Sequence, residues 1–426
     1  MLHWILAGAI GLIALAWLAT GARAAAARAD DQAALAQTRS LGDLIDQTQE
    51  RPVHILFVHG MRADGAGLAR PFMEGLCRYG PVRCPAGAVA PPAAQRHYID
   101  LGIRPSAEVT GSPVWRNEAE WRASRPFVDR YLIERDGAPP VIVDEVNWWP
   151  LLMPFRCRAL VGPESRLSGV DKAHLDLCRP WLTAAEYAAA MKGPRVSGGG
   201  AWANAALKRQ IMNWGLADAV IALGPMRTLI RRAIDEAFGF AAAFDGRGAA
   251  GQEFVVVAES LGSFVVLDAA GHADAPRARE VVAATSDLYF FANQFALLEL
   301  GRVSGLPTAA QPDLARPAFA APAPEISPFA VLSKWSTGPA IRPELAASPQ
   351  PRQVIAFSDP SDMLTYDVPP LPGAIVVNVY DRNEFDWFGL IADPIAAHSG
   401  HSRNPAVLKL MFERRLPPVS KPAGPS

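Results

Sequence analysis

Residues 253–270 read Glu253-Phe-Val-Val-Val-Ala-Glu-Ser260-Leu-Gly-Ser-Phe-Val-Val-Leu-Asp-Ala-Ala270 and contain the most informative pattern in the sequence. After Glu253, its first part is apolar and rich in β-branched valine, which predicts a short buried strand. Its last part is compatible with a helix. Between them lies a small-x-Ser-x-Gly pattern, with Ala258 first and Gly262 last, which predicts a strained turn that exposes Ser260. Both ends of the pattern must be small, because bulk there would collide with the neighbouring strand and helix.

Three other strand candidates end in polar residues that can take part in catalysis. The apolar run 52–58 ends in His59-Gly60-Met61. The run 353–357 is followed by two acids, and the run 374–380 is followed, after a loop, by two histidines. The acids are Asp359 and Asp362, and the histidines are His398 and His401. Along the chain the order is therefore a His-Gly strand end, a serine, an acid and a histidine.

This order resembles that of the α/β-hydrolase superfamily, whose catalytic residues follow one another as serine, acid and histidine. The resemblance covers about residues 50 to 415. It implies an α/β fold with a doubly wound, mostly parallel sheet, and a nucleophilic serine at position 260. A serine needs a base that takes its proton, and the base needs a carboxylate that fixes its tautomer. The competing interpretation of Ser260 is an ordinary strand-to-helix turn without chemistry.

Two candidates stand for the acid and two for the base. Asp362 has the spacing that the superfamily shows after this strand, with an apolar residue two positions later, and we favour it. Asp359 lies nearer the strand end, where it is suited to cap the turn before Pro360. His398 lies where the superfamily carries its histidine, ahead of a helix that Asn404-Pro405 would begin, and we favour it as the base. His401 is its rival, or a residue that lines the pocket.

The resemblance also implies an oxyanion hole, a set of donors for the negative oxygen of a tetrahedral intermediate. Its donors would be the backbone N–H groups of Met61 and Leu261. His59 would brace the segment that carries the first donor, and Gly60 and Gly262 would allow close packing around Ser260.

The organisation expected along the chain is one hydrolase domain over residues 51–415, with six strands separated by helices. A polar, amphipathic helix over 31–50 leads into it, and no strand candidate precedes residue 52. Helices are expected at 201–223, 225–243 and 261–270. Two insertions, 77–140 and 150–200, exceed what simple connections need. A proline-rich connection covers 304–352, and a proline-rich tail covers 416–426.

Seven of the eleven tryptophans lie between residues 115 and 214, in and around the two insertions. They suggest an aromatic cap or lid over the site, which would favour a hydrophobic or lipid-like substrate. Equally, they are suited simply to bury the insertions against the sheet.

Composition excludes several classes of function. The net charge is −1 and the pI is near 6.7, which gives no electrostatic basis for binding nucleic acid. No phosphate-binding or dinucleotide-binding glycine motif follows a strand, and no cysteine or histidine spacing predicts a metal site. We therefore expect neither a cofactor nor a metal.

The first 24 residues predict an export signal or a membrane anchor. Residues 2–19 are almost wholly apolar, and Ala22-Arg23-Ala24 resembles a small-x-small cleavage site. The segment is also nearly long enough to span a bilayer, and it has no Lys or Arg before the apolar run. Cleavage, anchoring and, as a third case, a buried helix of the domain therefore remain open. Either of the first two implies a cell-envelope location, exported or membrane-anchored, with membrane contact through residues 2–19.

The four cysteines form two local pairs, Cys77/Cys84 and Cys157/Cys178. An even count beside an export segment fits two disulfides in an oxidising compartment. The alternative is four thiols in a reduced protein.

Together these features favour a serine hydrolase that cleaves a carboxylic ester, of the carboxylesterase or lipase type. Thioesterase, acyltransferase and peptidase activities use the same residues. The hypothesis from another class is a non-catalytic binding module of the cell envelope, because a fold does not fix a function.

Overall fold

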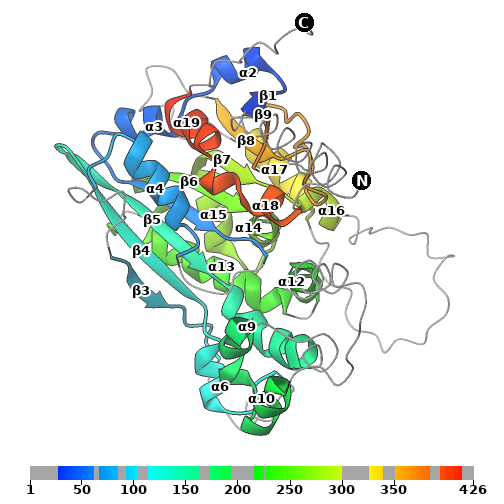
Figure 1. The fold of residues 1–426 in the computed structure, drawn as a ribbon. Helices are drawn as coiled ribbons and strands as arrows, with labels where there is room; N and C mark the ends of the chain where they lie inside the picture. Colours follow the sequence, from blue (N-terminus) through cyan, green and yellow to red (C-terminus); the bar gives the residue numbers. More distant parts are fainter. Residues whose placement is uncertain are drawn as a thin grey trace, which may run out of the picture.

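The structure, a computed structural model, describes residues 27–61, 67–84, 93–103, 114–162, 172–192, 215–224, 226–246, 248–299, 326–338, 351–383 and 394–414. Within these ranges one mixed sheet of nine strands runs through the molecule, in the order β1-β9-β8-β7-β6-β2-β5-β4-β3 (Figure 1). Helices cover both of its faces. The expected α/β class with a mostly parallel sheet is confirmed.

The six central strands of this sheet are the six that the sequence predicts, and they run parallel to one another. β2, β7 and β8 are wholly buried and β6 nearly so, whereas three residues of β5 and four of β9 are partly buried. Because helices cover both faces of the sheet, each strand carries an apolar run. In sheet order they are β9 (Ala374–Asp381), β8 (Arg352–Ser358), β7 (Thr285–Phe291), β6 (Glu253–Glu259), β2 (Val53–Val58) and β5 (Ala138–Asn147).

Three antiparallel strands at the two edges were not expected. β1 (Ala27–Ala29) pairs with β9, so the expectation that no strand precedes residue 52 is wrong. β4 (Phe127–Arg135) pairs with β5, and β3 (Gln95–Tyr98) pairs with β4. Part of the insertion expected at 77–140 therefore extends the sheet. Hydrophobic patterns in the sequence do not predict these strands, because β1 has three residues, β3 is exposed along its length, and charged residues interrupt β4.

Alternate residues of each central strand point to two separate cores. In β2, Leu56 and Val58 join one core, whereas Ile55 and Phe57 join the other. The first core is covered by α12 (Ala217–Leu223), α13 (Arg227–Ala242), α14 (Leu261–Gly271), α15 (Pro276–Ala284), α16 (Phe295–Glu299) and α17 (Pro328–Ser336). The second is covered by α3 (Leu41–Gln47), α4 (Arg70–Tyr79) and α19 (Pro405–Glu413).

The predicted helices are largely present. α13 and α14 match the helices expected at 225–243 and 261–270. α12 forms the end of the helix expected at 201–223, whose residues 201–214 lie outside the described ranges. The single helix expected over 31–50 is two helices, α2 (Gln32–Gln37) and α3, because Ser40 caps a new helix start through a reciprocal bond with Asp43.

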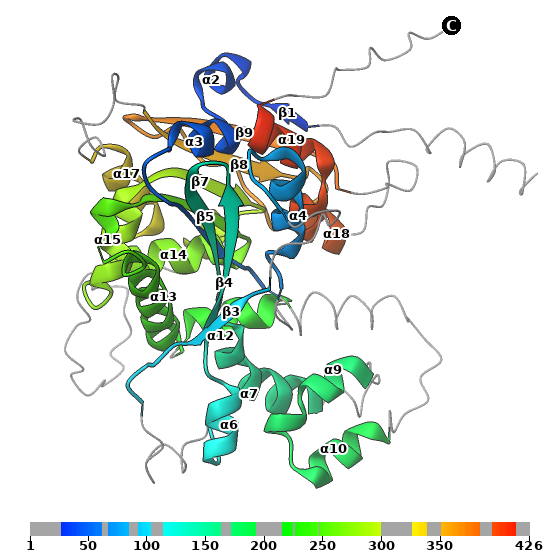
Figure 2. The ribbon, with the colours of Figure 1, turned by 90° about the vertical axis from the view of Figure 1, so that its left-hand side faces the viewer.

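α3, near the start of the described chain, and α19, its last described helix, pack together on the second core. α3 packs against α19, and a Cβ atom added at Gly42 would lie 2.2 Å from the carbonyl oxygen of Phe412. Only a glycine allows two helix backbones to come this close. Figure 2 shows α2, β1 and α19 together at one end of the molecule.

The opposite end of the molecule carries a small helical cap (Figure 2). It comprises α6 (Glu118–Ala123), η1 (Trp149–Leu152), α7 (Met153–Phe155), the π-helix η2 (Arg156–Val161), α9 (Lys172–Leu177), η3 (Arg179–Trp181) and α10 (Ala184–Met191). The cap has a core of its own, formed around Met153, Leu175 and Trp181.

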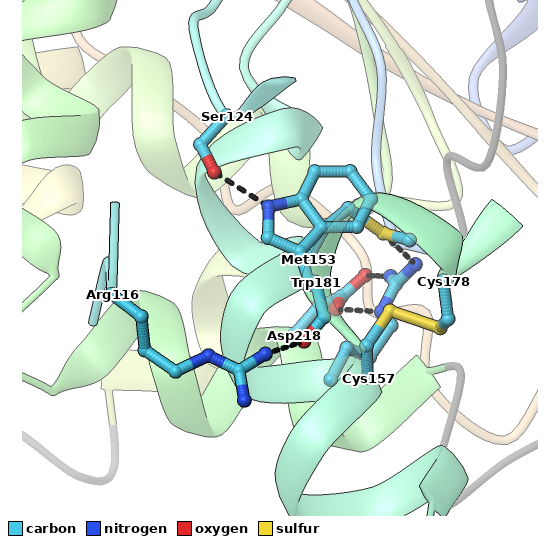
Figure 3. Close-up of a disulfide and its surroundings, with 8 residues drawn as sticks. Arg116, Ser124, Met153, Cys157, Cys178, Trp181 and Asp218 are labelled. Carbon is cyan, nitrogen blue, oxygen red and sulfur yellow. Dashed lines mark hydrogen bonds and ion pairs between the residues drawn. A yellow bond between two sulfur atoms is a disulfide. The ribbon is translucent and has the colours of Figure 1, made fainter. Parts of the chain in front are cut away.

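Two interactions hold the cap together and tie it to the rest of the domain (Figure 3). The Cys157–Cys178 disulfide joins η2 to the end of α9. The fully buried Arg156 forms an ion pair with Asp218 of α12, with Nε donating to Oδ1 at 2.9 Å. The second expected pair, Cys77–Cys84, is also a disulfide, and it links the end of α4 to the chain that follows.

Several expectations fall outside the described residues. They are the signal or anchor over residues 1–24, the tail 416–426, and most of the proline-rich connection 304–352, of which 326–338 contains α17. Within the described ranges, no helix has the length and apolar character that crossing a membrane requires.

We expect replacement of both Cys157 and Cys178 by serine to lower the free energy of unfolding by about 3 kcal/mol, because the bond closes a loop of 21 residues. Replacement of Cys77 and Cys84, which close a loop of 7 residues, should cost less. Urea unfolding without reductant measures both. A larger loss from the Cys77/Cys84 variant would contradict this ranking.

Candidate active site

Ser260 occupies a strained turn between β6 and α14. Its backbone has φ 54° and ψ −125°, in a region that residues other than glycine rarely adopt. The Ser260 N–H donates to the carbonyl oxygen of Phe291, at the end of the neighbouring strand β7, at 2.7 Å. The turn therefore has the form that the small-x-Ser-x-Gly pattern predicts. The sheet before it and the helix after it keep its backbone in this strained conformation.

Two glycines allow the end of β2 to pack against this turn. A Cβ atom added at Gly60 would lie 2.3 Å from Cβ of Ser260, and one added at Gly262 would lie 2.2 Å from the carbonyl oxygen of Val58. Both distances are far below any real contact, so neither position accepts a side chain without a backbone shift. The steric reason expected for Gly262 is thus present in the structure.

Ser260, His398 and Asp362 form a continuous hydrogen-bonded chain. Oγ of Ser260 lies 2.7 Å from Nε2 of His398, and Nδ1 of His398 lies 2.7 Å from Oδ2 of Asp362. The other carboxylate oxygen of Asp362 accepts the N–H of Leu364 at 2.9 Å, which fixes the orientation of the acid. His398 belongs to α18 (Pro394–Ser399), and Asp362 follows β8. The favoured acid and the favoured histidine are the two that lie in line with the serine.

Asp359, the alternative acid, has a different set of partners. Its Oδ1 accepts the N–H of Ser361 at 2.8 Å, and its Oδ2 accepts the N–H of Asn383 at 2.7 Å. The side-chain amide nitrogen of Asn383 in turn donates to the carbonyl oxygen of Ala397, the residue before His398, at 3.0 Å. Asp359 thus caps the turn after β8 and, through Asn383, supports the segment that carries the histidine. Sequence reasoning missed Asn383, which no motif distinguishes.

His401, the alternative base, also has another partner. Its Nδ1 lies 2.9 Å from Oδ2 of Asp381, and its ring stacks against Phe291. Burial has the largest single effect and would lower the pKa of His401, but the charge and hydrogen bond of Asp381, together with the charges of Asp362 and Glu259, raise it. The residue is therefore a buried member of an ion pair beside the site, and in this structure its ring does not contact Ser260.

The peptide group between Gly60 and Met61 is held in one orientation by His59. Nδ1 of His59 lies 2.9 Å from the carbonyl oxygen of Gly60. Burial lowers the pKa of His59 to about 4, so the ring is neutral near pH 7, and Nδ1 must carry its proton to donate to this carbonyl. In a trans peptide the C=O and N–H groups point in opposite directions, so fixing the Gly60 carbonyl also fixes the N–H of Met61. Leu261 is the first residue of α14, where N–H groups have no acceptor within the helix.

Gln294 is a further residue at the site that sequence reasoning missed. Its Nε2 lies 3.4 Å from Nε2 of His398, and its side chain is buried. Ala292 lies two residues before Gln294 and has a φ of 49°. It is the second residue with a strained backbone next to the serine turn. The N–H of Ala292 donates to the carbonyl oxygen of Phe357 at 2.9 Å, which ties this bend to β8.

A cavity of about 560 Å³ opens above Ser260. Much of its wall is apolar, from Met61, Leu68, Pro71, Met363, Leu364 and Ile395. None of the tryptophans that the structure describes lines it, so these tryptophans pack the cap and the sheet and do not form the wall. Besides Asp362, the charged residues Arg70, Glu259 and Arg403 also line it. Burial raises the pKa of Glu259, partly offset by the nearby His398, His401 and Arg403.

Comparison of the chain with protein-family models, with curated proteins and with solved structures finds no match.

The His401–Asp381 pair predicts a pH-dependent contribution to stability. The folded-state pKa of His401 lies above its usual 6.5, so the contribution is complete below about pH 6.5 and is lost as the pH rises through the folded value. We expect Asp381→Asn to lower the free energy of unfolding more at about pH 6 than at about pH 9. Urea unfolding at the two pH values measures this.

The matched control is Asp367→Asn, which removes an exposed acid that accepts the hydroxyl of Tyr380 at 2.7 Å. Its effect should be small at both pH values. An equal loss of stability in Asp381→Asn at both pH values would show that the histidine charge is not involved.

Proposed function

We propose that this protein is a serine hydrolase with an α/β-hydrolase fold, which cleaves a carboxylic ester through an acyl-enzyme intermediate. One observation carries the proposal. Ser260 lies on a strained strand-to-helix turn, 2.7 Å from His398, whose other ring nitrogen lies 2.7 Å from Asp362. A hydroxyl, an imidazole and a carboxylate in this order are what nucleophilic catalysis by serine requires.

The proposed reaction begins when Oγ of Ser260 attacks the ester carbonyl carbon as its proton passes to Nε2 of His398. The carboxylate of Asp362 stabilises the imidazolium, and the carbonyl π electrons become a negative charge on oxygen, to which the N–H groups of Met61 and Leu261 would donate hydrogen bonds. When the intermediate collapses, the alcohol leaves with the proton from His398. Water then repeats the sequence on the acyl-serine and releases the acid.

The cavity supports an ester with an apolar group beside the scissile bond. Its apolar wall lies around the serine, and its volume of about 560 Å³ is within the range of small-molecule sites. A medium-sized acyl ester or a lipid-like ester fits this description. A thioester, or transfer of the acyl group to an alcohol instead of water, would use the same residues.

The location that we propose is the cell envelope, by export or by membrane anchoring. Two disulfides support this proposal, because such bonds persist mainly in oxidising compartments.

A fluorophosphonate probe tests the proposal directly. We expect covalent labelling at Ser260, because the probe uses the same base and the same oxyanion donors as an ester. Labelling and hydrolysis of a short-chain aryl ester should both disappear in Ser260→Ala and His398→Ala, while the melting temperatures change little. Mass spectrometry of the labelled peptide identifies the site. A folded wild-type protein that neither labels nor hydrolyses any ester would support the alternative, a non-catalytic binding module.

The two aspartates near β8 provide a matched pair of variants. Asp362→Asn should lower kcat by about 10⁴, because an asparagine stabilises the wrong tautomer of the histidine. Asp359→Asn removes a turn cap and should mainly lower stability, by about 1 kcal/mol. Steady-state kinetics and thermal unfolding of both variants separate the roles. The opposite ranking in kcat would assign the acid to Asp359.

A further inference from the structure

Two buried residues near the carboxyl end of β5 contact the chain that leaves β2, and the proposed reaction does not use either. The first is Glu145. Its Oε1 accepts the N–H groups of Gly67 and Leu68, both at 2.9 Å, and its Oε2 accepts the N–H of Ala69 at 3.4 Å. The hydroxyl of Tyr131 donates to Oε2 at 3.3 Å. One carboxylate thus fixes the turn through which the chain enters α4, and two residues of that turn line the cavity.

The second is Trp148, which is fully buried. Its indole Nε1–H donates to the carbonyl oxygen of His59 at 3.1 Å. Its ring also stacks on the imidazole of His59, with the ring centres 5.1 Å apart and the planes at 8°. Trp148 therefore holds both the backbone and the side chain of the residue that orients the Gly60–Met61 peptide.

We propose that Trp148 and Glu145 are positioning residues for the oxyanion side of the site. Trp148 acts through His59 on the direction of the Met61 N–H, and Glu145 acts through the Gly67–Ala69 turn on the adjacent cavity wall. This inference rests on the proposed function.

The chemistry of both residues supports positioning beyond simple packing. A buried carboxylate is unfavourable unless donors surround it, and an apolar residue at position 145 would fill the space without that cost. A hydrogen bond from an indole to a carbonyl fixes a direction, which stacking alone does not. Such precision matters in catalysis, since a displacement of about 1 Å at a reacting group can lower the rate about 100-fold.

Trp148→Phe is the sharpest variant, because it keeps an aromatic ring beside His59 and removes the N–H donor. We expect kcat for an aryl ester to fall about 10-fold to 100-fold, with KM within about twofold of the wild-type value. The matched control is Trp149→Phe, whose indole donates only to Asn147, at 3.3 Å, among the described residues. It should keep the wild-type kcat.

A trifluoromethyl ketone reports on the oxyanion donors separately. Oγ of Ser260 adds to its carbonyl carbon, the serine proton passes to His398, and the carbonyl oxygen becomes an oxyanion held by the same N–H groups. In Trp148→Phe its affinity should fall by about the same factor as kcat. A role confined to stability would leave both quantities unchanged in the folded variant.

Glu145→Gln tests the second anchor, because the amide replaces one acceptor oxygen with an NH₂ group that faces backbone N–H donors. We expect kcat to fall about 10-fold, and hydrogen exchange at the amides of residues 67–69 to accelerate. The control is Asp129→Asn, a buried acid directly opposite Glu145 on β4, which pairs with Arg96 and not with this turn.

The outcomes separate the two levels of the proposal. Wild-type kcat and ketone affinity in folded Trp148→Phe and Glu145→Gln would overturn the positioning roles and leave the serine hydrolase intact. A change in KM alone would overturn them as well. A wild-type protein without turnover and without ketone binding would refute the proposed function and the positioning roles together. If Glu145→Gln does not fold, Trp148→Phe, which changes no charge, carries the test.

Discussion

The close contact between the end of β2 and the turn at Ser260 is the constraint on which the site depends. The serine backbone lies in an unfavourable region, and such a conformation persists only where its surroundings fix it. The sheet fixes it through the bond to Phe291, and the glycines at 60 and 262 let β2 approach without a side chain between. A serine held this firmly keeps its hydroxyl in one place, which is a precondition for the proposed attack.

Around this contact, the polar residues form concentric layers. The serine, histidine and aspartate lie closest to the cavity. Behind them, Asp359 and Asn383 support the segment of the histidine, while His59 and Trp148 support the opposite side. The carboxylate of Asp359 accepts two backbone N–H groups, so it contributes orientation without being an unpaired buried charge. The layers come from different strand ends, which is why the edge of a mostly parallel sheet is suited to hold them.

The central part of the fold could be predicted from the sequence, because strands that are buried on both faces need continuous apolar runs. The serine turn follows from its local pattern, and the resemblance to the α/β-hydrolase superfamily favoured the acid and the histidine that lie in line with the serine. The edge strands could not be predicted this way, since Gln95–Tyr98 is exposed and has no apolar alternation. Glu145 and Trp148 could not be identified either, because their contacts join residues 78 and 89 positions apart, and only the folded sheet brings them together.

The interlocked helices α3 and α19 have a consequence for how the chain folds. The second core receives α3 from residues 41–47 and α19 from residues 405–413, with the glycine contact between them. During synthesis α3 is therefore made long before α19. Until almost the whole domain has been made, the face of α3 that α19 covers in the folded protein lacks this partner. Contacts between residues so far apart in the sequence slow folding and prolong the exposure of apolar surface. A chain that lacked its last helix would leave α3 without this packing partner.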